Sequence, residues 1–374
     1  MHMFAAFYFV IVLTIEKEWN ISYDQLIRLW TLGALLIGLG AIPFGWLSDR
    51  WSRSGTMTIM FIGMGFASII CGLSTSIFFL FISLSLLGVF CSIYHPVGIP
   101  WVINSANKQG RALGINGIFG GVGIGSGAFV AGTLTEILNW QLAFILPGFI
   151  SILIGFILIY LIFIDKISYK NFFITNDKKN HSRNEMIVIA SIMLLSMFAL
   201  GLTFHNTQTA LPKVFEIRIE NINSIQIGLM IGIIYFISGA TTFLGGLMAD
   251  RYNLKLIYLT GIFLQFPCYL AIAYISGYSL VILCILAAIF NASILPTENL
   301  LLSRFTPQKY HGVVYGIKFI LAFGSGPISV FLISEIYSIT LEFTYLFLIN
   351  AIMMALVSIF ILFLPIQPKE NLAN

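Results

Sequence analysis

Charge is what this 374-residue sequence lacks, because only 9% of its residues are Asp, Glu, Lys or Arg. A soluble protein must cover its surface with charged and polar groups, and this chain is 59% hydrophobic with a mean hydropathy of +0.96. The composition therefore excludes a soluble globular protein and predicts one embedded in a lipid bilayer. The net charge of +4 comes from dispersed basic residues, so we expect no nucleic-acid partner.

Cysteine and catalytic motifs are also scarce. The four cysteines, Cys71, Cys91, Cys268 and Cys284, all lie within apolar runs, where they are expected to be small core residues. The sequence contains no phosphate-binding loop, no HExxH pattern and no pair of carboxylates inside an apolar run. We therefore expect neither an enzyme, nor a metal site, nor a bound cofactor.

Long apolar runs fill the chain, and each is solidly apolar, which favours membrane helices over alternating barrel strands. Spans are predicted at residues 3–15, 26–47, 56–74, 77–103, 112–134, 141–164, 186–211, 225–248, 256–275, 279–303, 313–337 and 341–364. The predicted fold class is an all-α polytopic membrane protein with twelve helices. We expect a six-helix bundle over 1–164, a polar linker over 165–185 and a second bundle with a short tail over 186–374.

The basic residues predict the orientation. The loops after spans two, four, six, eight and ten, with the linker and the tail, hold 14 of the 19 Lys and Arg residues. These segments and both termini are therefore predicted to be cytoplasmic, in a protein of the inner cell membrane.

A short polar motif occurs twice. The stretch "GWLSDRWSRS" at 45–54 returns as "GLMADRYNLK" at 246–255, and a shift of 201 residues pairs Gly45 with Gly246 and Asp49 with Asp250. Matches held in register across several spans indicate a duplicated six-helix unit. Two similar halves around a site at mid-membrane are a recurrent plan of transporters.

The same register leaves the first span short. Span seven begins near Met186, so its counterpart would begin about 15 residues before Met1. We expect that the chain lacks the first half of its first helix, and a native short helix is the alternative. N-terminal sequencing of the native protein separates the two, because a mature start at Met1 would refute the expectation.

Twelve spans in two halves, with this motif after span two, resemble the major facilitator superfamily over the whole chain. The family motif fits Gly45, Leu47, Ser48, Asp49, Arg50, Trp51 and Arg53, whereas Ser52 and Ser54 depart from it. The stretches "YHPVG" at 94–98 and "GRALGINGIFGG" at 110–121 resemble the bacterial fosmidomycin-resistance branch.

The resemblance implies a secondary transporter that works by alternating access, normally as a monomer. It also implies a cytoplasmic latch between the halves, with Asp49 near Gly312 and Asp250 near Arg111. The expected latch residues are Gly45, Asp49, Arg50, Arg53, Gly246, Asp250 and Arg251. A tight turn with basic anchors is the alternative interpretation of the motif.

Ionisable residues inside a span are costly and usually functional. Glu298 is the one carboxylate well inside a span, and Lys318 lies at a similar depth on the next span. The pair is a candidate for proton coupling, or alternatively a static ion pair. His95, directly before Pro96, is a further candidate for proton relay or substrate binding, or a partner for a carbonyl that the proline leaves free.

The resemblance implies that spans one, four, seven and ten line a central cavity, and most polar residues fall on three of these. The expected cavity residues are His205, Asn206, Gln208, Thr209, Asn291, Ser92 and Asn116. Glycines of the fifth span predict close helix packing instead. That span lacks the family's Gly-Pro step and span four lacks an Arg, which disfavours a drug–proton antiporter.

The function expected from the sequence is proton-coupled transport of a small solute. Two alternatives stay open. An uncoupled facilitator would have the same fold and a flux that ignores the pH gradient. A transporter-like sensor would bind its ligand without moving it across the membrane.

Overall fold

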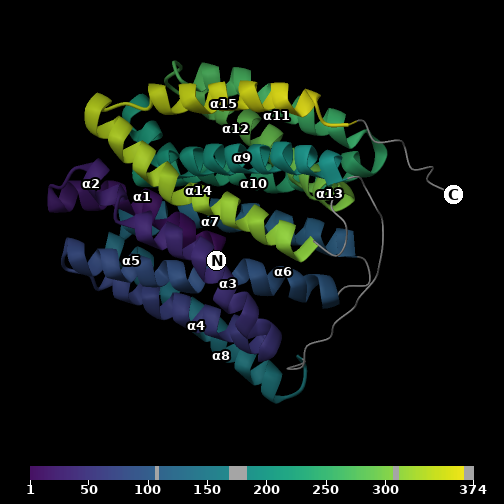
Figure 1. Ribbon diagram of the computed structural model, residues 1–374. Helices are drawn as coiled ribbons and strands as arrows, with labels where there is room; N and C mark the ends of the chain where they lie inside the picture. The colour runs from purple at the N-terminus through teal and green to yellow at the C-terminus, as the bar shows by residue number, and fades with distance from the viewer. Residues whose placement is uncertain (106–108, 168–182, 306–310, 366–374) are drawn as a thin grey trace.

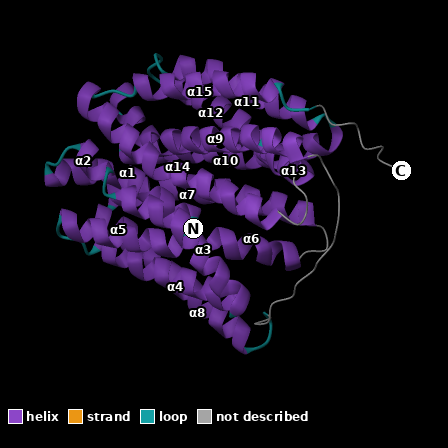
Figure 2. Ribbon diagram, in the orientation of Figure 1, coloured by secondary structure: helices purple, strands orange, loops and turns teal. Residues whose placement is uncertain are grey.

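Helices make up the structure throughout the described residues. The computed structural model describes residues 1–105, 109–167, 183–305 and 311–365, and Figure 2 shows helices and loops there without a strand. The N-terminal half contains α1 (His2–Trp19), α2 (Tyr23–Ile27), α3 (Trp30–Arg50), α4 (Arg53–Gly72), α5 (Ile77–Cys91), α6 (Tyr94–Ser105), α7 (Gln109–Ile137) and α8 (Trp140–Phe163). The C-terminal half contains α9 (Arg183–Arg218), α10 (Ser224–Arg251), α11 (Leu254–Ile272), α12 (Ser279–Ser293), α13 (Leu295–Phe305), α14 (His311–Thr340) and α15 (Thr344–Leu362). The predicted all-α fold is confirmed.

Eleven helical segments of the described residues are long and apolar enough to cross a membrane. They correspond to predicted spans two to twelve. The first predicted span lies in α1, which begins near the centre of the molecule in Figure 1 and carries charged residues at its other end, from Glu16 to Glu18.

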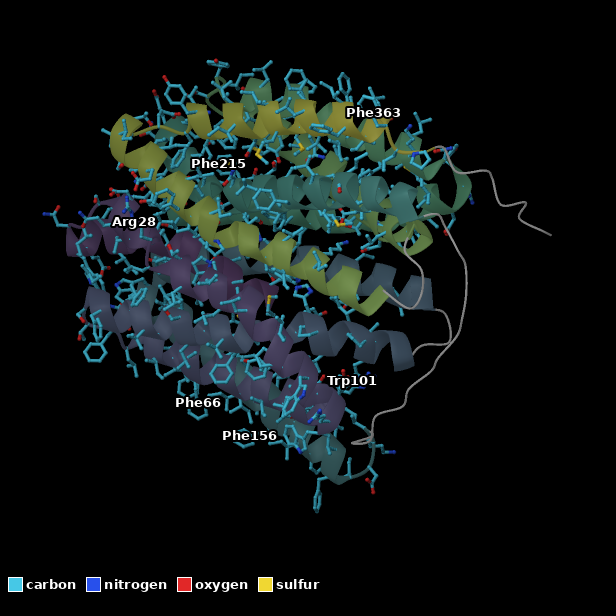
Figure 3. All side chains as sticks on the ribbon, viewed as in Figure 1. Arg28, Phe66, Trp101, Phe156, Phe215 and Phe363 are labelled. Atoms are coloured by element: carbon cyan, nitrogen blue, oxygen red, sulfur yellow. The ribbon has the colours of Figure 1, made fainter. Side chains whose placement is uncertain are left out.

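The outside of the molecule is apolar, as lipid requires. Phe66 of α4 and Phe156 of α8 are 55% and 56% exposed, and Figure 3 shows both on the outer surface of the N-terminal half. Phe215 of α9, in contrast, is completely buried among the helices of the C-terminal half. Large exposed aromatic side chains beside fully buried ones fit a protein whose outer solvent is hydrocarbon.

Two of the predicted spans are interrupted rather than continuous. Residues 77–103 form α5 and α6 with a break at Ser92 and Ile93, and residues 279–303 form α12 and α13 with a break at Ile294. The physical reason is proline: Pro96 and Pro296 have no N–H for the carbonyl four residues earlier, and their rings crowd it.

These breaks occupy corresponding positions in the two halves. A Cβ atom placed on Gly45 would lie 3.2 Å from Cβ of Pro96. One on its counterpart Gly246 would lie 4.0 Å from Cβ of Pro296. The repeated motif therefore packs against the interrupted helix in the same way in each half.

The most extensive contacts between the halves are those of α7 with α10 and of α3 with α14. On the first pair the helices come close through glycine. A Cβ atom placed on Gly121 would lie 2.6 Å from Cα of Gly239 and 2.7 Å from the carbonyl oxygen of Tyr235. The close packing that the glycines of span five predict is thus present, and it lies on the boundary between the halves.

Candidate functional site

Ion pairs join the two halves at the end of the molecule that carries α2. Nζ of Lys213 on α9 lies 2.6 Å from Oε2 of Glu16 on α1. Nη2 of Arg28, which follows α2, lies 2.5 Å from Oε1 of Glu335 on α14, and Figure 3 shows Arg28 at this end. This end, defined by these pairs and called the α2 end below, is closed.

Lys213 is the centre of this closure. Its side chain is 8% exposed, and Nζ also lies 2.8 Å from Oε2 of Glu216, whose other oxygen is 2.6 Å from Nζ of Lys17. The rings of Tyr23 and Tyr337 stand 5.5 Å and 5.6 Å from the ammonium, within range of cation–π attraction. Sequence reasoning missed the cluster, because it pairs residues almost 200 positions apart.

A small cavity of about 40 Å³ lies between the halves. It has room for a few water molecules. Its walls come from α1 and α3 of the N-terminal half and from α9 and α14 of the C-terminal half. The lining residues are Ala5, Phe9, Trp30, Ala34, Ile37, His205, Gln208, Thr209, Phe323, Gly326 and Val330.

Three of the expected cavity residues, His205, Gln208 and Thr209, line this cavity. Their spacing of i, i+3 and i+4 places them on one face of α9. Gln208 is 8% exposed as a whole residue, and its carboxamide has no hydrogen bond to another described side chain. A carboxamide that borders a cavity in this way is available to a ligand.

The rest of the polar run on α9 points into the C-terminal half. Nδ2 of Asn206 donates to Oδ1 of Asn350 on α15 at 2.8 Å, and both residues are fully buried. Thr207 donates to the Thr203 carbonyl at 2.8 Å and to the Tyr269 hydroxyl at 3.3 Å. Asn206, an expected cavity residue, therefore contributes to packing within its own half.

Other expected cavity residues are engaged elsewhere. Asn291 donates to Oε1 of Gln265 at 3.2 Å inside the C-terminal half. The hydroxyl of Ser92 donates to the Val89 carbonyl at 2.6 Å, and Asn116 accepts from the Tyr94 hydroxyl at 2.5 Å. None of the three belongs to the lining of the cavity.

His95 lies at the boundary between the halves. Its ring centre is 4.8 Å from that of Phe323, which lines the cavity from α14, and 5.2 Å from that of His2 on α1. Among the described residues no group of three or more His, Cys, Asp or Glu side chains is arranged to hold a metal ion.

The structure brings Glu298 and Lys318 together within the C-terminal half. Nζ of Lys318 lies 2.6 Å from Oε1 of Glu298, and these side chains are 10% and 3% exposed respectively. The Tyr258 hydroxyl donates to Oε2 of Glu298 at 3.2 Å, and the lysine also donates to Oδ1 of Asn299 at 2.6 Å. Both carboxylate oxygens are occupied, and the role of the pair in proton coupling stays a prediction.

The first copy of the repeated motif makes contacts within its own half. Nη2 of Arg53 lies 3.6 Å from Oδ1 of Asp49, and the guanidinium of Arg50 covers the Trp46 ring at 4.4 Å. The latch partners expected for the two aspartates, Gly312 and Arg111, lie outside the residues whose side chains are described. The latch stays a prediction.

Comparison with known proteins identifies the family. Residues 1–205 and residues 186–374 each match the Major Facilitator Superfamily, so the chain belongs to it. The fold agrees: a bacterial homologue of the human lysosomal transporter Spinster, solved in an inward-facing and unoccupied conformation, superposes with a TM-score of 0.69. That alignment covers 96% of this chain and 91% of the other at 15% identity.

Similarity to curated relatives is partial. The riboflavin transporter RibZ of Clostridioides difficile (strain 630) is 30% identical over 150 residues, which are 40% of this chain and 32% of the transporter. The puromycin resistance protein pur8 of Streptomyces alboniger is 27% identical over 119 residues, which are 30% and 24% of the two chains. An uncharacterized transporter of Buchnera aphidicola subsp. Schizaphis graminum (strain Sg) is 24% identical over 224 residues, 58% of this chain and 53% of that one. The matched segments thus span less than two thirds of each relative.

Proposed function

We propose that this protein is a secondary transporter that moves a small solute across the membrane by alternating access. The observation that carries the proposal is the polar face of α9, with its unsatisfied Gln208, set opposite α1 and α3 of the other half. A site at the boundary of two similar halves changes its exposure when the halves rock. The riboflavin transporter and the puromycin resistance protein among the relatives support a small organic solute.

The proposed orientation places the linker, both termini and the repeated motif in the cytoplasm, because 14 of the 19 basic residues lie on that side. The α2 end then faces away from the cytoplasm. The protein is proposed to act as a monomer in the inner membrane, with bundles over 1–164 and 186–374 and the linker over 165–185. Asp49 and Asp250 are proposed to close the cytoplasmic end when the α2 end opens.

Proton coupling is proposed to use Glu298 with Lys318, and His95 as a relay near the cavity. A buried ion pair within the membrane is costly unless both charges remain matched. Loss or gain of one proton on Glu298 would change that match, and α14, which carries Lys318, also packs against α3 of the other half. The pair therefore links protonation to the boundary along which the halves move.

Alternating access is tested without knowledge of the solute. A single cysteine at Gln208, in a background without the four native cysteines, is labelled by a membrane-impermeant thiol reagent added to either side of oriented vesicles. We expect labelling from both sides. An added disulfide between Arg28→Cys and Glu335→Cys should abolish labelling from the α2 side and a reductant should restore it. Identical one-sided labelling with and without the cross-link would contradict the proposal.

The same thiol tests proton coupling. Its labelling rate from the α2 side is compared at about pH 6 and pH 8. Each rate is normalised to that of unfolded protein at the same pH, and the same thiol in Glu298→Gln controls for the titration that burial shifts. We expect a pH-dependent rate in the parent and a constant rate in Glu298→Gln. Equal pH profiles would make Glu298 and Lys318 a static ion pair.

A further inference from the structure

The residues that line the cavity indicate which chemical class of solute it can bind. We propose that the cavity takes an uncharged solute with a flat ring whose edge both donates and accepts hydrogen bonds, such as a lactam or imide. This inference rests on the proposed transport function and deepens it. Three properties of the lining carry it: its lack of charge, its aromatic side chains and its unsatisfied amide.

The described lining contains no Asp, Glu, Lys or Arg. Two charged side chains on the helices that line it are already matched: Lys318 contacts Glu298, and Lys213 lies between Glu16 and Glu216. An ionic solute would lose its hydration without meeting a free counter-charge from these side chains or from a carboxylate, lysine or arginine of the lining, which is unfavourable in a membrane interior. The cavity therefore favours an uncharged solute.

Aromatic side chains reach the cavity from both halves. Phe9 and Trp30 come from α1 and α3, with ring centres 6.1 Å apart in an edge-to-face arrangement, and Phe323 comes from α14. Aromatic rings attract one another in offset-stacked or edge-to-face arrangements. A flat ring placed between these walls would contact both halves at once, as a solute that moves with them must.

The hydrogen-bonding edge is inferred from Gln208. A carboxamide offers two N–H donors and one carbonyl acceptor, and that of Gln208, a residue 8% exposed, borders the cavity without a hydrogen bond to another described side chain. Side-chain carboxamides pair in bidentate fashion with ring edges that present a donor beside an acceptor. The adjacent N–H and C=O of a lactam or imide present such an edge. Asn206 donates to Asn350 within its own half and does not line the cavity, which leaves this role to Gln208.

The volume of the cavity does not set the size of the solute. At about 40 Å³ it holds a few waters, so a solute must enter when the halves separate. Probes of two sizes are therefore needed. Uracil and riboflavin are both uncharged and both carry an imide edge, whereas orotate and riboflavin 5′-phosphate add a negative charge to the same rings.

The test measures ligand-induced thermal stabilisation of the purified full-length protein at neutral pH. We expect uracil or riboflavin to stabilise it, and the charged counterpart of the binder to bind at least tenfold more weakly. Ribitol, which has no ring, should not stabilise it, and 1,3-dimethyluracil, which has no N–H, should bind more weakly than uracil. Gln208→Leu should weaken the binding of the neutral ring compounds at least tenfold. Gln25→Leu, a matched change at an exposed position, should not.

Several results would overturn the inference. If a neutral compound and its charged counterpart bind equally well, the cavity does not select uncharged solutes. If Gln208→Leu binds the ring compounds as the parent does, Gln208 does not pair with the edge of the ring. If neither uracil nor riboflavin stabilises the protein while the Gln208→Cys thiol still becomes accessible from both sides, the solute class is wrong and transport stands. One-sided labelling with and without the cross-link would instead contradict the transport proposal itself.

Discussion

The ammonium of Lys213 lies 2.6 Å from the carboxylate of Glu16, and the two residues belong to opposite halves of the chain. The lysine side chain is 8% exposed, so the attraction acts largely away from solvent screening. The α2 end cannot open unless this pair separates and both ions find new partners. The pair thus contributes directly to the balance between conformations.

Removal of the lysine should favour opening. Lys213→Met leaves the partly buried Glu16 without its counter-ion and should shift the equilibrium toward an open α2 end by at least about tenfold, since a carboxylate removed from most of its water and from its partner is destabilised. The measurement is the distance distribution between spin labels at Ser22 and Ser338, which are exposed at this end on different halves. Lys255→Met is the control, because that ammonium donates to the Leu362 and Leu364 carbonyls within one half. An unchanged distribution in Lys213→Met would refute a gating role.

A methyl group at Gly121 should disturb the boundary between α7 and α10. Its Cβ would lie 2.6 Å from Cα of Gly239, and backbone atoms cannot move aside as a flexible side chain would. We expect Gly121→Ala to lower the free energy of unfolding by about 1–3 kcal/mol, the usual cost of overpacking. Thermal unfolding of the purified protein provides the measurement.

Gly324 supplies the matched control. A Cβ atom there would have no neighbour within 4 Å, although Gly324 also lies within a long helix, α14. Gly324→Ala should therefore leave stability unchanged or raise it slightly, because alanine has the higher helix propensity. Equal destabilisation by both substitutions would mean that close approach at Gly121 is not the cause.

The loop between α14 and α15 should make stability depend on acid pH. Burial raises the pKa of the Glu342 carboxyl, but hydrogen bonds from the Arg218 guanidinium and the Phe343 N–H outweigh burial and hold this pKa below its ordinary value. The stabilisation is therefore fully present above the unfolded pKa of about 4.3 and is lost as pH falls through the lower folded pKa.

Glu342→Gln should accordingly be less stable than the parent at neutral pH, by about 1 kcal/mol for a side chain that is 36% exposed and partly screened. Parallel melting curves should converge as the pH falls below about 4. A difference that stays constant from neutral to acid pH would show that the charge on Glu342 does not contribute.

The fold could be predicted from the sequence because the hydrocarbon of the membrane restricts which folds can span it. Spans of about 20 apolar residues in two similar halves leave little freedom in architecture. The breaks in spans four and ten escaped prediction, since Pro43, Pro147 and Pro267 lie within helices that the structure keeps continuous. A proline alone does not reveal whether its helix breaks.

The site was predictable in part. The polar run on α9 was visible, but which face it offers to the cavity depends on helices packed around it. Glu298 and Lys318 could be paired by depth, because they sit on consecutive spans. Lys213 and Glu16 could not, because their pairing follows from how the two halves dock.

The division of α9 into two faces has an evolutionary consequence. Asn206 and Thr207 hold the helix in its own half through Asn350 and Tyr269, whereas Gln208 lines the cavity and has no hydrogen bond to another described side chain. A lineage can therefore exchange Gln208 and bind a different solute while the fold is conserved. This arrangement permits related proteins to share one fold and transport different solutes.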